Sequence, residues 1–394
     1  MLARIEIKAF KSIREAAIDL GEVNVFIGAN GSGKSNILEA IGVLGAAAAG
    51  RVDDEALLRR GVRPGVPALY KTSFRGERVR DAIRFGAFAG SSSYEVELNN
   101  PIDQPRPAWT FKTEKLVVEG KKVLGRSRAS VSYQSLDPEQ GLAALKAVSL
   151  APGSAGSSLL KELREFAIYA PNTASLRGLV SDSQSRAPVG LAGGRLAEAV
   201  EELRHLARGD ERTEEVVEDV LGLVDWVETF GAKAGASVPL SPTIPRQQRV
   251  LFFRDRFMAE GRNEVSAYDT SEGALYVLFA AVVAIHPESP KFLAVDNFDA
   301  TLNPRLVRAL MAAVGQWVLG SGRQLLLTCH NPLVLDGLAL QDDRVRLFAV
   351  DRSARGFTAV RPVIVDDALL AKAREGWPLS RLWVSGNLGG VPNV

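Results

Sequence analysis

The stretch that decides the fold is Val23-Asn24-Val25-Phe26-Ile27-Gly28-Ala29-Asn30-Gly31-Ser32-Gly33-Lys34-Ser35-Asn36. Its first five residues form an apolar run that predicts a short buried strand, and apolar residues at helical spacing over 34–44 predict a helix. The loop between them is rich in glycine, which permits backbone turns that other residues resist. A helix N-terminus reached through such a loop presents N–H groups to an anion. The stretch therefore predicts a phosphate-binding loop.

Gly28, Gly33, Lys34 and Ser35 match the P-loop pattern, in which four residues separate two glycines and Lys and Ser follow. In this pattern the lysine reaches the β- and γ-phosphates and the serine hydroxyl binds Mg²⁺. The alternative is a glycine-rich turn with an exposed lysine, and the flanking strand and helix argue against it. The expected nucleotide-binding residues are Gly28, Ala29, Asn30, Gly31, Ser32, Gly33, Lys34 and Ser35.

A second apolar strand is predicted at residues 292–295, and Asp296 follows it directly. A P-loop ATPase needs an acidic residue at the end of a buried strand to hold Mg²⁺. The alternative is an aspartate that merely ends a strand. Beside a P-loop, the first interpretation is favoured, and Ser35 and Asp296 are the expected metal ligands.

The rest of the chain predicts an α/β fold assembled from both ends of the sequence. Short alternating stretches over 66–150 predict an antiparallel β-lobe, residues 152–158 resemble a linker, and helices are expected over 157–229, with Thr213 capping one of them. Strands at 250–253, 292–295 and 324–328 alternate with helices at 272–285 and 304–319, which favours a parallel sheet. The expected divisions are 1–150 and 246–365 for the two parts of the head, 151–245 for a helical insertion and 366–394 for a tail.

Composition excludes several classes of protein. The 394 residues carry a formal net charge of +2, which excludes a histone-like polycation and a wholly acidic disordered chain. One cysteine, Cys329, excludes an internal disulfide and a cysteine-type zinc site. The longest apolar run, residues 274–285, is shorter than the roughly 20 residues that span a bilayer. With no signal-peptide pattern at the start, we expect a cytoplasmic protein without a membrane partner.

Taken in order, several motifs resemble the ABC-type ATPases of the SMC, RecF and OLD group. They are the opening strand with Lys11-Ser12, the P-loop followed by Asn36, Ser271-Glu272-Gly273 before a long apolar helix, the run from Asp296 to Asn303, and Thr328-Cys329-His330-Asn331-Pro332 after a strand. Each short motif is weak alone, and their order around a P-loop is much stronger. The resemblance implies a P-loop ABC-type head with an inserted helical subdomain, and ATP and Mg²⁺ as cofactors.

The resemblance also implies roles for individual residues. Lys11, Ser12 and Asn36 would contact the nucleotide, and two heads would pack head to tail. Ser271, Glu272 and Gly273, the signature motif of one head, would then cover the γ-phosphate held by the other. The catalytic set would be Lys34, Asp296, Asn297 and His330, with His330 sensing the γ-phosphate.

Two departures from the group bear on function. The group usually has Glu after the strand-end aspartate, and here the residue is Asn297, which has no carboxylate and cannot act as a general base. Either hydrolysis is slow, or Asp299, Glu272 or a partner residue substitutes. The chain also leaves no room for a C-terminal nuclease domain of the OLD kind or for a long SMC arm.

These features favour an ATP-driven switch that controls a separate effector, a nuclease or toxin encoded nearby, with prokaryotic anti-phage defence as the setting that the resemblance implies. One alternative is a non-hydrolysing, ATP-bound scaffold. Another is a RecF-like ATPase of DNA repair. DNA is a candidate partner for that second alternative, through basic clusters at Arg59, Arg60 and Arg63, at Lys121, Lys122, Arg126 and Arg128, and at Arg246, Arg249, Arg254 and Arg256. For each cluster taken alone, solvated surface cations paired with neighbouring acids are the favoured interpretation.

Overall fold

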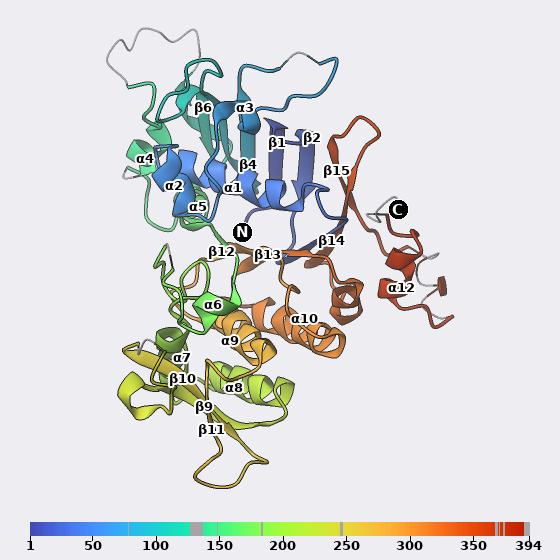
Figure 1. Ribbon diagram of the computed structural model, residues 1–394. Helices are drawn as coiled ribbons and strands as arrows, with labels where there is room; N and C mark the ends of the chain where they lie inside the picture. Colours follow the sequence, from blue (N-terminus) through green and yellow to red (C-terminus); the bar gives the residue numbers. More distant parts are fainter. Residues whose placement is uncertain are drawn as a thin grey trace.

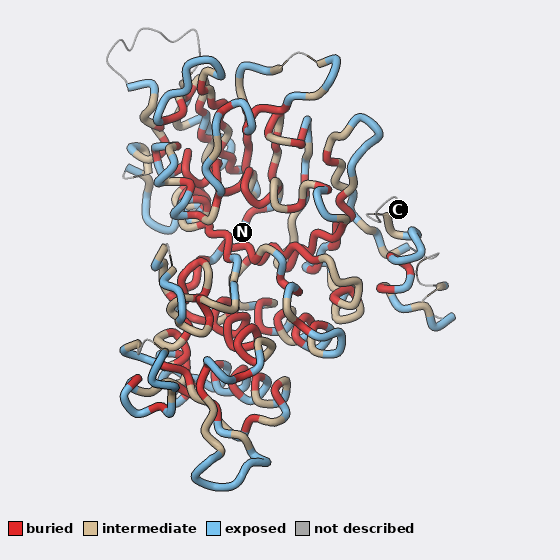
Figure 2. Tube along the Cα trace, in the orientation of Figure 1, coloured by how far each residue is buried: buried red, intermediate tan, exposed pale blue. Residues whose placement is uncertain are grey.

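The computed structural model describes residues 1–77, 79–126, 137–147, 149–182, 184–244, 247–366, 369, 371–372 and 375–389. A parallel sheet crosses the middle of the molecule, an antiparallel sheet with its helices lies on one side, and a helical layer lies on the other (Figure 1). The most buried backbone runs along the central strands, whereas the loops at both ends are exposed (Figure 2). This arrangement confirms the predicted α/β class with an antiparallel β-lobe.

The central sheet contains the P-loop strand in its interior. Its order is β15–β14–β3–β13–β12–β8, and all neighbours are parallel except β14 and β15. Side chains of the P-loop strand alternate between the two faces: Val23, Val25 and Ile27 pack against the helical layer, and Phe26 packs toward the antiparallel sheet. The strands are β3 (Val23–Ile27), β8 (Ala167–Tyr169), β12 (Phe292–Val295), β13 (Gln324–Cys329), β14 (Val345–Arg352) and β15 (Thr358–Pro362).

The antiparallel sheet has the order β2–β1–β4–β5–β6–β7, so the opening strand belongs to the predicted β-lobe. Strand β2 was not expected. The strands are β1 (Arg4–Phe10), β2 (Ile13–Asp19), β4 (Ile83–Ala89), β5 (Ser92–Asn99), β6 (Thr110–Val118) and β7 (Lys121–Arg126). The helices on this side are α1 (Lys34–Ala48), α2 (Asp54–Leu58), α3 (Pro67–Tyr70), α4 (Leu142–Ala147) and α5 (Ala155–Glu165).

The segment expected to be a linker begins helix α5 instead. The Ser154 side chain accepts a hydrogen bond from the backbone N–H of Ser157, so the small polar residues that suggested a linker include an N-cap. The region 157–229 is also not wholly helical, because strand β8 pairs with β12 at the edge of the central sheet. A strand of three buried residues, Ala167–Tyr169, is too short to give a clear sequence signal.

The helical layer covers the other face of the central sheet. Its helices are α6 (Thr173–Leu176), α7 (Leu196–Leu206), α8 (Glu211–Leu223), α9 (Glu272–Ile285) and α10 (Pro304–Val318), and a three-stranded antiparallel sheet, β9 (Val227–Ala234), β10 (Arg249–Asp255) and β11 (Glu264–Ser266), lies beside them. Strand β10 was expected in the parallel sheet, and it pairs instead with β9 and β11. The N-cap of α8 is Asp210, which accepts from the Thr213 N–H; the prediction that Thr213 is the cap was wrong.

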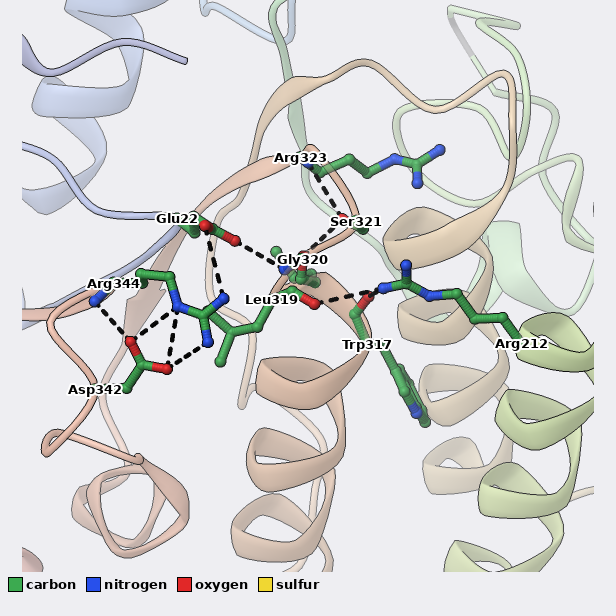
Figure 3. Close-up of polar contacts among 10 residues, drawn as sticks. Glu22, Arg212, Trp317, Leu319, Gly320, Ser321, Arg323, Asp342 and Arg344 are labelled. Atoms are coloured by element: carbon green, nitrogen blue, oxygen red, sulfur yellow. Dashed lines mark hydrogen bonds and ion pairs between the residues drawn. The ribbon is translucent and has the colours of Figure 1, made fainter.

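Polar contacts at the C-terminal end of α10 tie the helical layer to the central sheet (Figure 3). Arg212 on α8 donates to the carbonyl of Trp317 at 2.9 Å. Glu22, just before β3, accepts from the backbone N–H of Gly320 at 2.9 Å and lies 3.9 Å from the Arg344 guanidinium. Because helix carbonyl ends carry partial negative charge, Arg212 is well placed there.

The last described elements pack beside the loop that follows β13. The 3-10 helix η2 (Pro332–Gly337) contacts α12 (Leu379–Val384), and the Ser380 hydroxyl donates to Asp336 at 2.6 Å. Within the described ranges, no helix is both long enough and apolar enough to span a lipid bilayer.

Candidate nucleotide site

The P-loop connects the end of β3 to the start of α1 and packs closely against β15. Gly31 and Gly33 have φ of 76° and 108°, in the left-handed region that glycine adopts without strain. A Cβ added to Gly33 would lie 2.1 Å from Thr358 Oγ1, whereas one added to Gly31 would meet nothing within 4 Å. The loop is therefore tight at Gly33 and open at Gly31.

Lys34 turns its ammonium back over the loop. Its Nζ donates to the carbonyls of Gly28 at 2.6 Å and Ala29 at 3.0 Å, and the residue is only 4% exposed. Burial lowers the pKa of Lys34 to about 8, and nearby Asp296 and Asp299 oppose that shift. A buried cation held by neutral carbonyls favours an incoming anion.

Ser35 and Asp296 meet as the sequence predicts. Ser35 Oγ donates to Asp296 Oδ1 at 3.1 Å, and the Thr328 hydroxyl donates to the same oxygen. These hard oxygen donors suit a magnesium ion. Ser32 Oγ is buried and has no hydrogen-bond partner among the described residues, so its hydroxyl remains available to a bound group. The residues present thus fit a nucleoside triphosphate with a divalent cation.

His330 links Lys34 to Asn297. Lys34 Nζ lies 3.3 Å from His330 Nδ1, and His330 Nε2 lies 3.0 Å from Asn297 Oδ1. Since an ammonium can only donate, Nδ1 accepts and Nε2 carries the proton that is donated to Asn297. Burial, helped by the Lys34 charge, lowers the pKa of His330 and favours this neutral form.

The two residues considered as replacement bases differ in position: Asp299 has one oxygen engaged by the His330 loop, and Glu272 lies elsewhere. Asp299 is 7% exposed, and its Oδ2 accepts from the backbone N–H groups of His330, at 2.7 Å, and Asn331. Glu272 lines a different cavity. The carboxylate of Asp299 instead holds the loop that carries His330.

Lys11, Ser12 and Asn36 lie beside the P-loop, as the resemblance implies. Asn36 Nδ2 donates to Ser12 Oγ at 2.7 Å, and the Ser12 and Thr358 hydroxyls are 2.7 Å apart. Thr358 donates to the Ser32 carbonyl at 2.7 Å. This chain of hydrogen bonds joins α1, β15 and the turn after β1 around the loop.

A cavity of about 520 Å³ opens next to this chain and is lined by Lys11, Ser12, Asn36, Arg63 and Arg352, among others. Lys11 and Arg63 both pair with Glu39 on α1, and the Arg63 contact is 2.6 Å. Burial lowers the pKa of Lys11, although Glu39 opposes that shift. Arg352 Nε donates to the Gly31 carbonyl at 2.8 Å.

The signature residues are not brought to the P-loop of their own chain. Ser271 caps α9 by accepting from the Ala274 N–H at 3.4 Å. Ser271, Glu272 and Gly273 line a cavity of about 700 Å³ together with Trp226 and Arg305, and no P-loop residue is among its described lining.

Sequence reasoning missed Glu39, Thr328, Thr358 and Arg352 as site residues. Thr328 stood in a recognised motif, but Thr358 and Arg352 lie over 300 residues from the P-loop and carry no motif. Only the pairing of β14 with β3 brings them there. Of the basic clusters, Arg128 and Arg246 lie outside the described residues, and Arg59 and Arg249 pair with Glu55 and Glu201.

Two family models match the two parts of the chain that together form the site. A family model described as "AAA ATPase domain" matches residues 1–56, and one described as "AAA domain, putative AbiEii toxin, Type IV TA system" matches residues 200–336. The DNA replication and repair protein RecF of Renibacterium salmoninarum is 36% identical over 100 residues, which cover 25% of this chain and 22% of that protein. RecF of Acidothermus cellulolyticus is 44% identical over 62 residues, 15% of this chain and 17% of that protein. The chain thus spans about a fifth of the length of these curated relatives.

Among solved structures, the chain is similar to an SMC head bound to the C-winged helix domain of ScpA. The match covers 94% of this chain and 99% of that one, with a TM-score of 0.53 and 13% identity. The likeness extends over both sheets and the helical layer, so the fold is that of an SMC head, a P-loop ABC-type architecture.

Proposed function

We propose, from the premise that this chain is an ABC-type P-loop ATPase of the SMC and RecF group, that it binds ATP with Mg²⁺ and closes over it as a head-to-tail pair. The observation that carries the proposal is the meeting of Lys34, Ser35, Asp296 and His330 where β3, β12 and β13 end. Ligands of parallel sheets bind at the carboxyl ends of the strands.

Each residue has a definite task in this proposal. The P-loop N–H groups and Lys34 bind the phosphates, and Ser35 and Asp296 would hold Mg²⁺, which supplies charge stabilisation when bound. His330 faces the same region as Lys34, so it would respond to the γ-phosphate. Lys11, Ser12 and Asn36 would contact the nucleotide from the neighbouring cavity.

The pairing of two copies is supported by the position of Ser271. It caps α9, a 14-residue helix whose N-terminus would favour a phosphate, yet it lines a cavity separate from its own P-loop. A second copy would supply the missing half, with Ser271 and Gly273 covering the γ-phosphate held by the first.

Slow turnover is the expected consequence of Asn297. An amide can orient a water molecule but cannot take its proton, and Oδ2 of Asp299 already accepts from two backbone N–H groups. The ATP-bound pair would therefore last long enough to act as a switch that controls a separate effector, a nuclease or toxin encoded nearby. The description of one matching family model, which names a toxin and a toxin–antitoxin system, supports a setting in prokaryotic defence.

The second candidate is a RecF-like role in DNA repair, which is favoured by the two RecF matches. A third candidate is a non-hydrolysing, ATP-bound scaffold. A DNA affinity that falls steeply with salt would support the repair role.

The experiment is a mass measurement in solution with ATP and Mg²⁺, made for the unaltered chain, for Lys34→Ala and for Ser271→Arg. We expect ATP to convert monomers into dimers for the unaltered chain alone. Ser271→Arg should still bind ATP, because its own P-loop is intact. Dimers that form equally well with Ser271→Arg would refute the head-to-tail arrangement, and a constant large particle would support the scaffold.

A further inference from the structure

A third cavity, of about 700 Å³, lies between α2, the end of α5 and residues 184–186, apart from both cavities already described. Its lining carries five arginines and two carboxylates. Both carboxylates are already engaged: Asp53 pairs with Arg51, and Glu55 pairs with Arg59. The remaining cations, Arg60, Arg164 and Arg186, have no carboxylate partner among the described residues. We call this the arginine cavity.

Backbone carbonyls hold two of these guanidinium groups in place. Arg60 donates to the carbonyls of Ala56, at 2.8 Å, and Arg164, at 3.0 Å. Arg186 donates to the carbonyls of Arg59, at 3.0 Å, Phe166, at 3.2 Å, and Glu165. The carbonyl ends of helices favour cations, and α2 and α5 both end here, which explains the positions of these side chains; the Glu165 carboxylate offsets part of the charge of Arg186.

Arg60 is the most buried arginine of this lining. It is only 7% exposed, and its Nε, which has no hydrogen-bond partner in the described part of the chain, lies near Gly45 of α1 and is closed to solvent. Burial and the nearby Arg186, Arg164 and Arg59 together lower the pKa of Arg60 to about 10. Burying a charge is costly, so an anion in the cavity would stabilise this cluster, in which arginines outnumber carboxylates.

The shape of the cavity favours a small ligand. Its volume lies in the range that is usual for small-molecule sites, roughly 300–1,000 Å³. Arg60 is buried, whereas Arg164 is exposed. A nucleic acid backbone lying across the surface would meet Arg164 and would not reach the buried guanidinium of Arg60. Arginine forks match phosphate oxygens in a two-point contact.

We infer that the arginine cavity binds the terminal phosphate of a small phosphorylated molecule, at a site separate from the P-loop. Arg60 and Arg186 contact the phosphate in the interior of the cavity, and Arg164 closes over it from the surface. Gln184 and Ser185, which also line the cavity, offer neutral hydrogen-bonding groups to the rest of the ligand. This site is independent of ATP hydrolysis and of the pairing of two copies.

Calorimetric titration with inorganic pyrophosphate tests the inference in a Lys34→Ala background, which weakens phosphate binding at the P-loop. Pyrophosphate should bind, and adding Arg164→Gln or Arg186→Gln should weaken its affinity about tenfold or more, because each removes a charge-assisted hydrogen bond. Arg208→Gln is the matched control, since Arg208 is an exposed arginine outside the arginine cavity, and it should change nothing.

The described Arg164 side chain makes no hydrogen bond that its loss could break, so Arg164→Gln decides the result even if Arg186→Gln melts at a lower temperature. Pyrophosphate binding that is absent, or that is equal with and without Arg164→Gln, would overturn the inference. A parallel titration with duplex DNA covers the other source of phosphate. The inference would also be overturned if the protein bound DNA through Arg164 and did not bind pyrophosphate.

Discussion

Replacing Gly33 with alanine tests how tightly the P-loop is packed. Gly33 has φ of 108°, and an added Cβ would lie 2.1 Å from Thr358 Oγ1 and 3.0 Å from Ser12 Oγ. Both hydroxyls belong to the hydrogen-bond chain that joins α1, β15 and the turn after β1. Gly33→Ala must therefore strain the backbone and also push that chain apart.

Gly31→Ala separates these two effects. Gly31 also has a positive φ, of 76°, but nothing lies within 4 Å of its added Cβ. A left-handed alanine costs about 1–2 kcal/mol, and this is the whole loss expected for Gly31→Ala. Overpacking costs about 1–3 kcal/mol more, so Gly33→Ala should lose about 2–5 kcal/mol of unfolding free energy in total.

Urea unfolding without nucleotide measures both losses. Gly33→Ala combined with Thr358→Ala should recover part of the steric loss, since the closest clashing atom is gone. The recovery is incomplete, because the left-handed φ remains and Thr358 Oγ1 no longer donates to the Ser32 carbonyl. Equal stability of Gly33→Ala and Gly31→Ala would refute the reasoning, because it would mean that β15 does not press on the P-loop.

Three further perturbations probe the same site and its surroundings. Asn297→Glu should raise ATP turnover by about tenfold or more by adding a general base, measured as phosphate release; unchanged turnover with intact ATP binding would contradict the assigned role. ATP affinity should fall by up to about tenfold per pH unit above about pH 8. The reason is that burial lowers the Lys34 pKa to about 8, and a neutral amine attracts phosphate less than an ammonium does. An affinity that calorimetry finds constant from about pH 7.5 to about pH 9.5 would count against this. Asn303→Ala should cost about 1 kcal/mol in thermal or urea unfolding, since Asn303 Oδ1 caps α10 by accepting from the Leu306 N–H at 2.9 Å, and Asn303→Asp should be nearly neutral.

The elements that sequence predicted best are those with dense apolar patterning. Strands β3 and β12 and helix α9 have the predicted bounds, because continuous apolar runs between polar or glycine residues leave little choice of ends. The P-loop and Asp296 were predicted for the same reason: each follows directly on such a strand. The local sequence pattern was therefore enough to predict a site residue wherever that residue directly follows an apolar strand.

Residues that reach the site through long-range pairing could not be found this way. Thr358 contacts Ser12 across 346 positions, and nothing in the local sequence around Thr358 marks it. Strand β10 shows the opposite error, because its apolar pattern is real but carries no information on which sheet it joins. Pairing depends on the whole chain, whereas patterning is a property of a few residues.

The left-handed backbone at Asn297 gives a physical reason for the departure from the usual glutamate. With φ of 55°, the chain reverses direction so that the Asn297 N–H donates to Thr328 Oγ1, at 2.8 Å, and the Phe298 N–H donates to the Thr328 carbonyl, at 3.0 Å. Asparagine adopts this region more readily than most residues, since its short amide tolerates it. The same amide accepts from His330 Nε2, which fixes the proton on Nε2 and leaves Nδ1 turned toward Lys34. Asn297 thus holds the His330 side chain in one orientation but cannot abstract a proton from water. Slow hydrolysis is what the proposed long-lived ATP-bound pair requires.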